Sequence, residues 1–295
     1  MSTSTTLAPG STLGVLARQE IRNYLRHKLF WFGAALSVAV AVVMLVADDP
    51  TSSAGYMIAP AALLGVLGLV VMVGLTRRSD RAAESAGAVV LPERTRTLAL
   101  AAAVVVPAGL AFAVWVVAAV VWFVKPAADY VVPPGIGDGF VLAAMFGAGV
   151  MCAVGGPILG LLLARYVHTR GTAAIAAVLL VLVTILLQGN FTGGQPYRVF
   201  WVWTYFLGQL GWGPDAAGEI HFRTAPGNPF TWVLYLAVLC AVGLVLALLH
   251  DPEAERDGLR RVAAGLVVAA LVLGVVTMTL GWTDVVVDPL PCTTC

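Results

Sequence analysis

The sequence predicts an all-α polytopic membrane protein with about seven transmembrane helices, preceded by an amphipathic interfacial helix. Of its 295 residues, 60% are hydrophobic and 11% are charged, whereas soluble domains are about 45–50% apolar. Seven apolar runs are each close to the ~20 residues that cross a bilayer. No charged side chain lies inside a run. Because ionisable groups within the bilayer usually form ion-coupling sites, their absence argues against a self-energised pump.

The runs divide the chain into a cytoplasmic N-terminus at 1–29, a transmembrane domain at 30–282 and an extracellular tail at 283–295. The predicted spans are residues 30–47, 57–76, 98–124, 141–164, 172–188, 231–249 and 262–282. Fourteen of the 17 basic residues lie before the first span or after the second, fourth and sixth. Since cytoplasmic loops carry an excess of Lys and Arg, the N-terminus is predicted inside and the C-terminus outside. The preference for Arg over Lys, with abundant Ala, Val and Gly, suggests a GC-rich bacterial genome, so the membrane is expected to be a bacterial plasma membrane.

An amphipathic segment precedes the first span. Its apolar residues recur at helical spacing and are Leu13, Leu16, Ala17, Ile21, Tyr24 and Leu25. Arg18, Arg22 and Arg26 fall on the other face, as in a helix that lies in the interface with its basic side toward anionic headgroups. The alternative is a charged flank that only orients the first span. Three turns of apolar face favour the interfacial helix.

The loop at 77–97 is the longest on the predicted cytoplasmic side. Ser79 can cap a short helix that runs through Glu84, and Gly87 can end it. The apolar stretch at 88–91 then stops at Pro92. A short helix standing off the membrane suits docking in a groove of a soluble partner. A solvated linker explains the composition equally well, and both interpretations stay open.

The predicted outer loop between the fifth and sixth spans is unusually aromatic. Its clustered rings are Phe200, Trp201, Trp203, Tyr205, Phe206 and Trp212. Short apolar stretches are often re-entrant or interfacial, so we expect short helices dipping into the outer leaflet. An aromatic belt at the headgroups is the alternative. Asn228 and Pro229 are expected to cap and begin the sixth span.

Helix breakers interrupt two spans. Pro107 lies in the third, and the fourth contains Gly155, Gly156 and Pro157, with Gly160 one turn beyond Gly156. Such positions must face neighbouring helices or a cavity, and small residues four apart allow close packing. Packing is favoured over a transport path. Before the last span, Asp251 and the acids after it are expected to start a helix that extends from the membrane.

No catalytic or metal site is predicted. The chain has no Gly-x-x-x-x-Gly-Lys-Ser/Thr loop for nucleotide phosphates, so no cofactor is expected on it. Its four histidines, His27, His168, His221 and His250, are not spaced as metal ligands and are expected to be polar surface residues.

The cysteines form two groups. Cys152 and Cys240, inside spans, are expected to be small packing residues. Cys292 and Cys295, on the predicted oxidising side, could form a disulfide. A redox role would require a surrounding fold that tunes the pKa values of the thiols.

The order of these features resembles the permease subunit of type-2-class ABC exporters. The resemblance covers residues 13–250: interfacial helix, two spans, cytoplasmic helix and hydrophobic outer loop. Locally, Glu84-Ser-Ala-Gly87, with Val90-Leu91-Pro92 and Arg96, is similar to the family's Glu/Arg-x-x-Gly-x-x-x-x-Leu-x-x-Pro pattern. Residues 228–235 are similar to its start of the sixth span. The seventh span and the outside C-terminus depart from the usual six spans.

The resemblance implies a transporter rather than an enzyme, moving amphipathic or hydrophobic cargo. A helix contacting the ATPase would contain Asp80, Arg81, Glu84, Gly87, Leu91 and Glu93. The implied partners are a dimeric cytoplasmic subunit that holds ATP and Mg, a second permease chain of the same or another sequence, and the lipid bilayer, without nucleic acid. Two alternatives stay open: a membrane enzyme or redox protein using Cys292 and Cys295, and a non-transporting anchor of a sensor complex.

Overall fold

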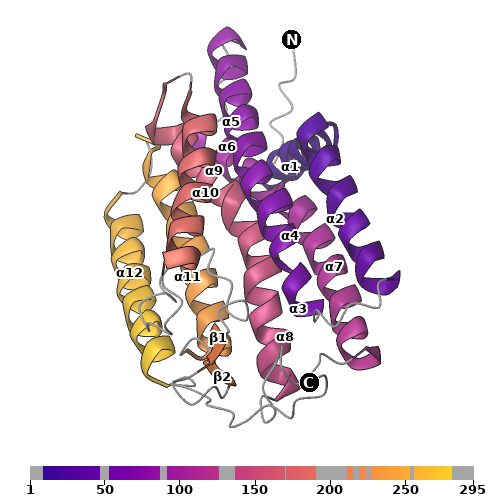
Figure 1. Ribbon diagram of the computed structural model, residues 1–295. Coiled ribbons are helices and arrows are strands. Elements are labelled where there is room, and N and C mark those ends of the chain that lie inside the picture. The colour runs from indigo at the N-terminus through magenta and orange to yellow at the C-terminus, as the bar shows by residue number, and fades with distance from the viewer. Residues whose placement is uncertain are drawn as a thin grey trace, which may run out of the picture.

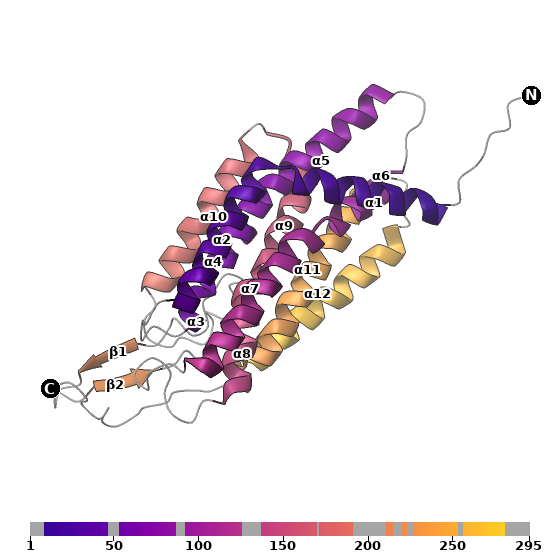
Figure 2. The same cartoon turned by 90° about the vertical axis from the view of Figure 1, so that its right-hand side faces the viewer.

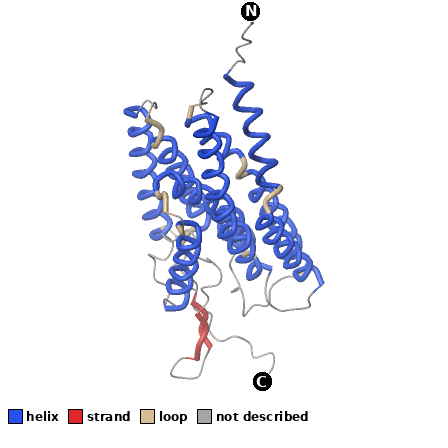
Figure 3. The backbone as a smooth tube through the Cα atoms, turned by 90° about the horizontal axis from the view of Figure 1, so that it is seen from above, coloured by secondary structure: helices blue, strands red, loops and turns tan. Residues whose placement is uncertain are grey.

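The structure is a computed structural model that describes residues 9–46, 53–86, 92–125, 137–169, 171–190, 211–214, 220–223, 227–252 and 256–280. Figure 3 shows that these residues are helical except for short connections and two strands. The first elements are α1 (Pro9–Leu25), α2 (Lys28–Val46), α3 (Ser53–Tyr56), α4 (Ile58–Pro60), the π-helical η1 (Ala61–Val66), α5 (Leu67–Ala86), α6 (Glu93–Ala102) and α7 (Val105–Val124). They are followed by α8 (Asp138–Phe146), the π-helical η2 (Gly147–Met151), α9 (Cys152–Tyr166), α10 (Thr172–Asn190), β1 (Gly211–Pro214), β2 (Ile220–Arg223), α11 (Pro229–Leu249) and α12 (Arg256–Thr279).

Among the described residues, six helical stretches are long and apolar enough to cross a membrane. They are Lys28–Val46, Ser53–Ala83, Glu93–Val124, Asp138–Tyr166, Pro229–Leu249 and Arg256–Thr279. Large apolar side chains remain exposed on several of them, including Phe112 and Leu271, and such a surface suits lipid rather than water. The prediction of a helical membrane protein is therefore confirmed.

The fifth predicted span does not reach the same length. It forms α10, whose described apolar part, Thr172–Leu186, is shorter than the other six. α10 lies alongside the other helices (Figure 1). A count of seven spans stays a prediction.

The bundle has two chemically different ends. At one end, called the charged end below, α5, α9 and α11 finish and α6 and α12 begin. Figure 2 shows α1 lying across this end, and β1 and β2 at the opposite one. The predicted helix before the first span is thus present, and its Tyr24 is fully buried against the bundle.

Two local predictions were wrong. Ser79 does not begin a separate helix, because α5 continues without a break from Leu67 to Ala86 and stands beyond its neighbours (Figure 1). Residues 77–86 contain neither Gly nor Pro, so nothing stops the helix as it leaves the apolar layer. Trp212 lies in β1, paired antiparallel with β2, rather than in a helix. Its neighbours Gly211, Gly213 and Pro214 are the weakest helix formers.

The ends of the last two helices also bear on predictions. Asn228 caps α11 as expected: its side chain accepts from the backbone N–H groups of Phe230 at 3.0 Å and Thr231 at 3.3 Å. α12 begins at Arg256, ahead of the apolar run, so the predicted extension is present. Asp251, however, bonds to α6 rather than capping α12.

Glycines bring α9 against the second span. A Cβ at Gly156 would collide with the carbonyl oxygen of Gly65, and one at Gly160 with the carbonyl oxygen of Leu69. A Cβ at Gly68 would come within 2.9 Å of the ring of Pro157. With no side chains between them, the two backbones touch directly.

The two π-helical segments lie in these same two spans. η1 and η2 contact each other, and Gly65 of η1 is one side of the glycine contact. The Trp115 indole on α7 donates to the carbonyl oxygen of Leu142, one turn before η2, at 3.1 Å. Since π-helical turns widen a helix and interrupt its regular hydrogen bonds, both spans are irregular at the same level.

Candidate functional site

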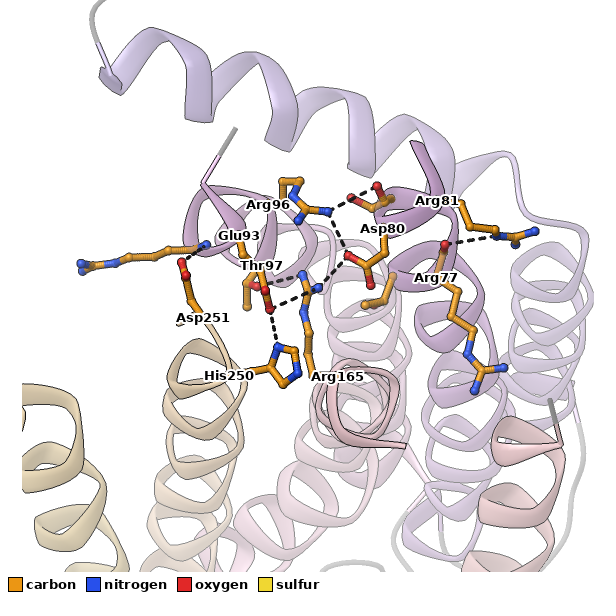
Figure 4. A network of polar contacts seen from close by, with 12 residues as sticks. Arg77, Asp80, Arg81, Glu93, Arg96, Thr97, Arg165, His250 and Asp251 are labelled. Atoms are coloured by element: carbon orange, nitrogen blue, oxygen red, sulfur yellow. Dashed lines mark hydrogen bonds and ion pairs between the residues drawn. The ribbon is translucent and has the colours of Figure 1, made fainter. Parts of the chain in front are cut away.

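The strongest candidate site is a network of charged side chains at the charged end (Figure 4). Its centre is Arg165, in the last turn of α9, whose side chain is only 2% exposed. One guanidinium nitrogen lies 2.7 Å from Asp80 of α5 and 3.4 Å from Glu93 of α6. The other donates to the hydroxyl of Thr97 at 2.9 Å. A single side chain therefore joins the ends of three helices.

Asp80 is shared between two arginines. In addition to Arg165, it accepts from Arg96 of α6 at 2.9 Å. The same Arg96 nitrogen also lies 3.4 Å from the carbonyl oxygen of Ser79. The contact between α5 and α6 thus depends on a carboxylate in the first turn beyond the apolar part of α5.

The end of α11 completes the network. Nδ1 of His250 lies 2.7 Å from Glu93, and the Asp251 carboxylate accepts from the backbone N–H of Arg94 at 2.9 Å. This N–H belongs to the first turn of α6, where helical N–H groups lack partners within the helix. Asp251 therefore caps α6 from a neighbouring helix, and an acid at that position also favours the helix dipole.

The ion-paired side chains of the network balance in charge. Asp80 and Glu93 face Arg96 and Arg165, and Asp251, which bonds to a backbone N–H, adds one negative charge. Arg165 also ends a helix, where a cation favours the dipole. Buried pairs of this kind contribute little net stability when intact, but are costly when one partner is removed. The arrangement can hold four helix ends in one geometry and release them together.

Two buried donors of the network are unsatisfied. Among the described residues, the Nε atoms of Arg96 and Arg165 are buried without a hydrogen-bond acceptor. Within the same part of the chain, no group of three His, Cys, Asp or Glu is placed to hold a metal ion. The hydrogen bonding of the two arginines is therefore incomplete.

Burial shifts the pKa of two groups that attach α1 to this end. It raises the pKa of Tyr24 well above its ordinary value, so the hydroxyl stays neutral. It lowers the pKa of His27, between α1 and α2, because the charged imidazolium is disfavoured away from water.

The residues predicted to contact an ATPase divide into three groups. Asp80 and Glu93 are engaged within the chain, as described above. Arg81 is exposed on the projecting part of α5, and its Nε donates to the carbonyl oxygen of Arg77 at 3.3 Å. Glu84 belongs to α5, but its side chain, like Gly87 and Leu91, lies outside the described residues.

The other predicted sites are placed as follows. Pro107 is buried in the first turn of α7, just after the break between α6 and α7. Gly155 lines an apolar pocket beside the packing glycines Gly156 and Gly160. The aromatic residues from Phe200 to Phe206, and the pair Cys292 and Cys295, lie outside the described residues.

Sequence reasoning missed the network itself. Arg165 was counted only as a basic loop residue, and His250 was taken for a surface histidine, although its side chain is about one-third exposed and bonded to Glu93. A signal was present: the ends of the second, fourth and sixth spans and the start of the third must meet on one side. Because opposite charges occur at these four positions, ion pairs between them could have been predicted.

Comparisons of the chain with protein-family models, with curated proteins and with solved structures gave no match. The described residues form a helical membrane protein with a network of ion pairs at one end of its bundle.

Proposed function

We propose that the chain is the membrane-spanning permease subunit of an ATP-driven exporter. In this proposal a separate cytoplasmic ATPase dimer supplies the energy, and two permease chains move an amphipathic or hydrophobic cargo. The observation that carries the proposal is the projecting end of α5, which is connected through Asp80 to the network below it.

The orientation follows from charge. The charged end includes most of the basic residues, and such loops face the cytoplasm in membrane proteins. In this orientation the end of α5, with Arg77, Arg78 and Arg81, would be within reach of a soluble ATPase. α1 would lie in the inner interface, with its basic residues at the headgroups.

The network offers a route from α5 into the bundle. A force on the projecting end of α5 would act first on Asp80, which is bonded to Arg96 on α6 and Arg165 on α9. Through Glu93 it would also reach His250 on α11. Helix ends joined by such contacts move as a unit or separate as a unit, and transporters need this behaviour to rock between two states.

The middle of the bundle offers places to bend. η1 and η2 lie side by side in the second and fourth spans, and π-helical turns are common at functional positions within helices. Rocking of the charged end relative to the opposite end would then require small changes at these segments. The regular helical turns on either side could move as rigid pieces.

The chemistry of the spans supports an external energy source and an apolar cargo. The sequence has no phosphate-binding loop, and no charged residue lies within an apolar run. Without charged clamps in the spans, the cargo path would suit apolar or amphipathic molecules.

The experiment is a matched pair of charge reversals, Arg81→Glu on the end of α5 and Arg260→Glu on α12. Both side chains are exposed near the same end, and neither belongs to the network. Arg81→Glu should weaken co-purification of a nucleotide-hydrolysing partner by about tenfold, because a charge at a docking surface is reversed. Arg260→Glu should leave it unchanged. Equal binding by both variants would contradict docking at α5.

A further inference from the structure

An apolar pocket of about 200 Å³ lies between α9 and α11, apart from the charged network. Its walls include Cys152, Ile158 and Leu162 of α9, and Leu239, Cys240 and Leu246 of α11. Leu162, Leu239, Cys240 and Leu246 are each half-buried. The pocket therefore opens onto the outer surface of the bundle, which faces lipid in a membrane.

Small residues give the pocket its depth. Gly243 on α11 faces Ile158, and a Cβ at this glycine would come within 2.8 Å of an Ile158 methyl group. Cys152 and Cys240 stand where larger apolar residues would fill the space. The two helices are thus close at the pocket floor and leave a furrow outside it.

The length of the furrow matches one leaflet of a bilayer. It extends from Met151 to Leu162 along α9 and from Leu236 to Leu246 along α11. At a rise of about 1.5 Å per residue these segments are ~15 Å long, which is half of a hydrocarbon core of ~30 Å. Both helices run toward the charged end, so the furrow occupies the leaflet on that side.

The charged-end limit of the furrow is polar. The hydroxyl of Tyr166 on α9 donates to the carbonyl oxygen of Leu246, a wall residue, at 2.9 Å. The ring of His250 meets Tyr166 edge-on at 5.3 Å, and His168 lies 6.5 Å from His250. Tyr166 is 52% exposed. Tyrosine favours the headgroup level, where one side of the ring is apolar and the hydroxyl is hydrated.

We propose that this furrow is a phospholipid site: one acyl chain lies between α9 and α11, and the headgroup lies beside Tyr166, His168 and His250. A phospholipid fits the polarity of the furrow. Over the length of one leaflet its lining changes from wholly apolar walls to hydroxyl and imidazole groups. A protein partner of the same chain would not require that gradient. The proposal goes beyond the proposed function and does not depend on it.

The test uses the full chain in vesicles of phosphatidylcholine and phosphatidylglycerol, with a phosphatidylcholine that carries a photoreactive diazirine in the middle of one acyl chain. After illumination, cross-linked peptides are mapped by mass spectrometry. We expect cross-links in 151–162 and 236–246. Cross-links spread evenly over exposed residues of α2, α7 and α12 would overturn the proposal.

A matched pair of variants tests the pocket itself. Cys240→Phe fills it, whereas Ala237→Phe adds the same ring to an exposed position on α11 outside the pocket. In Cys240→Phe the added ring should exclude about two methylene groups of the acyl chain from the furrow. Cross-linking at 151–162 should therefore fall by about tenfold. Ala237→Phe should match the wild type. Equal cross-linking in both variants would overturn the proposal.

Two further experiments identify the occupant of the furrow. Moving the diazirine to a phosphatidylglycerol of the same acyl composition reports whether the headgroup charge matters, and cross-linking of either lipid in the furrow supports the site. A short bifunctional maleimide that joins Cys240 of two chains, together with absent lipid cross-links, would assign the furrow to a second copy and overturn the proposal. If Cys240→Phe does not fold, the wild-type peptide map decides alone.

Discussion

Arg165 shows why an arginine, rather than a lysine, suits the end of α9. Its guanidinium presents several donors in a fixed plane, and here two nitrogens reach Asp80, Glu93 and Thr97 on two other helices. A lysine ammonium is a point charge and could not hold these acceptors in the same geometry. The side chain is almost fully buried, so removing it would leave two carboxylates without their main partner.

We therefore expect Arg165→Gln to lower the free energy of unfolding by about 3–5 kcal/mol, the usual cost of breaking a buried ion pair. Arg81→Gln should change it by less than about 0.5 kcal/mol, since substitutions at exposed positions away from such networks have small effects. Unfolding of both variants in the same detergent gives the comparison. Equal stability of the two variants would mean that the network does not hold the helix ends.

The pairing of His250 with Glu93 can be tested separately. His250→Phe keeps a ring against Tyr166 but removes the nitrogen that lies 2.7 Å from Glu93. Because a hydrogen bond to a charged group contributes about 1.5–3 kcal/mol, stability should fall by that amount. His168→Phe, on an exposed residue beside it, is the control and should unfold like the wild type.

At the level of elements, α9 and the second span pack closely because glycines leave no side chains between their backbones. Gly156→Leu should push α9 away from η1, because any Cβ there meets the carbonyl oxygen of Gly65. Overpacking of this kind costs about 1–3 kcal/mol or more. Gly74→Leu is the matched control, since nothing lies within 4 Å of a Cβ at Gly74. That variant should be neutral or more stable by up to about 1 kcal/mol, because leucine is the better helix former. Unfolding temperatures that fall equally would exclude the direct backbone contact.

Helices were predictable from the sequence because their signal is local. Apolar runs of membrane-spanning length and the Asn228–Pro229 start of α11 are each contained within a few adjacent residues. The glycine contacts were also foreseeable as packing sites, although the facing residues, Gly65 and Leu69, were not.

What sequence reasoning missed depends on contacts between distant segments. Asp80 and Arg165 are 85 positions apart, and their meeting follows from the topology rather than from any motif. The change from α-helix to π-helix at η1 and η2 leaves no comparable pattern in composition. The strand pair at Trp212 was missed because clustered aromatic rings were weighted above the helix-breaking glycines and proline beside them.

For the whole molecule, the network constrains how the chain threads the membrane. The ends of α5, α9 and α11 and the start of α6 must share one side, since their side chains touch. α10 follows α9 at that side, and α11 begins at the opposite one.

Cysteine labelling tests this topology in cells that express the protein without Cys292 and Cys295. A membrane-impermeant thiol reagent should label Gly137→Cys, at the start of α8, in intact cells. It should label Ser79→Cys only after permeabilisation, because the basic loops are expected inside. The reverse pattern would invert the molecule and remove α5 from the reach of a cytoplasmic partner.

The most direct test of the proposed transporter is nucleotide hydrolysis, measured on the purified chain alone and on the complex that a tagged chain retains from its own membranes. The chain has no phosphate-binding loop, so we expect no hydrolysis by the chain alone. The retained complex should hydrolyse ATP through a separate soluble subunit that contains such a loop, and Arg81→Glu should reduce both this subunit and the activity. Hydrolysis by the isolated chain, or a complete complex without any ATPase, would contradict the assignment as a permease driven by a partner.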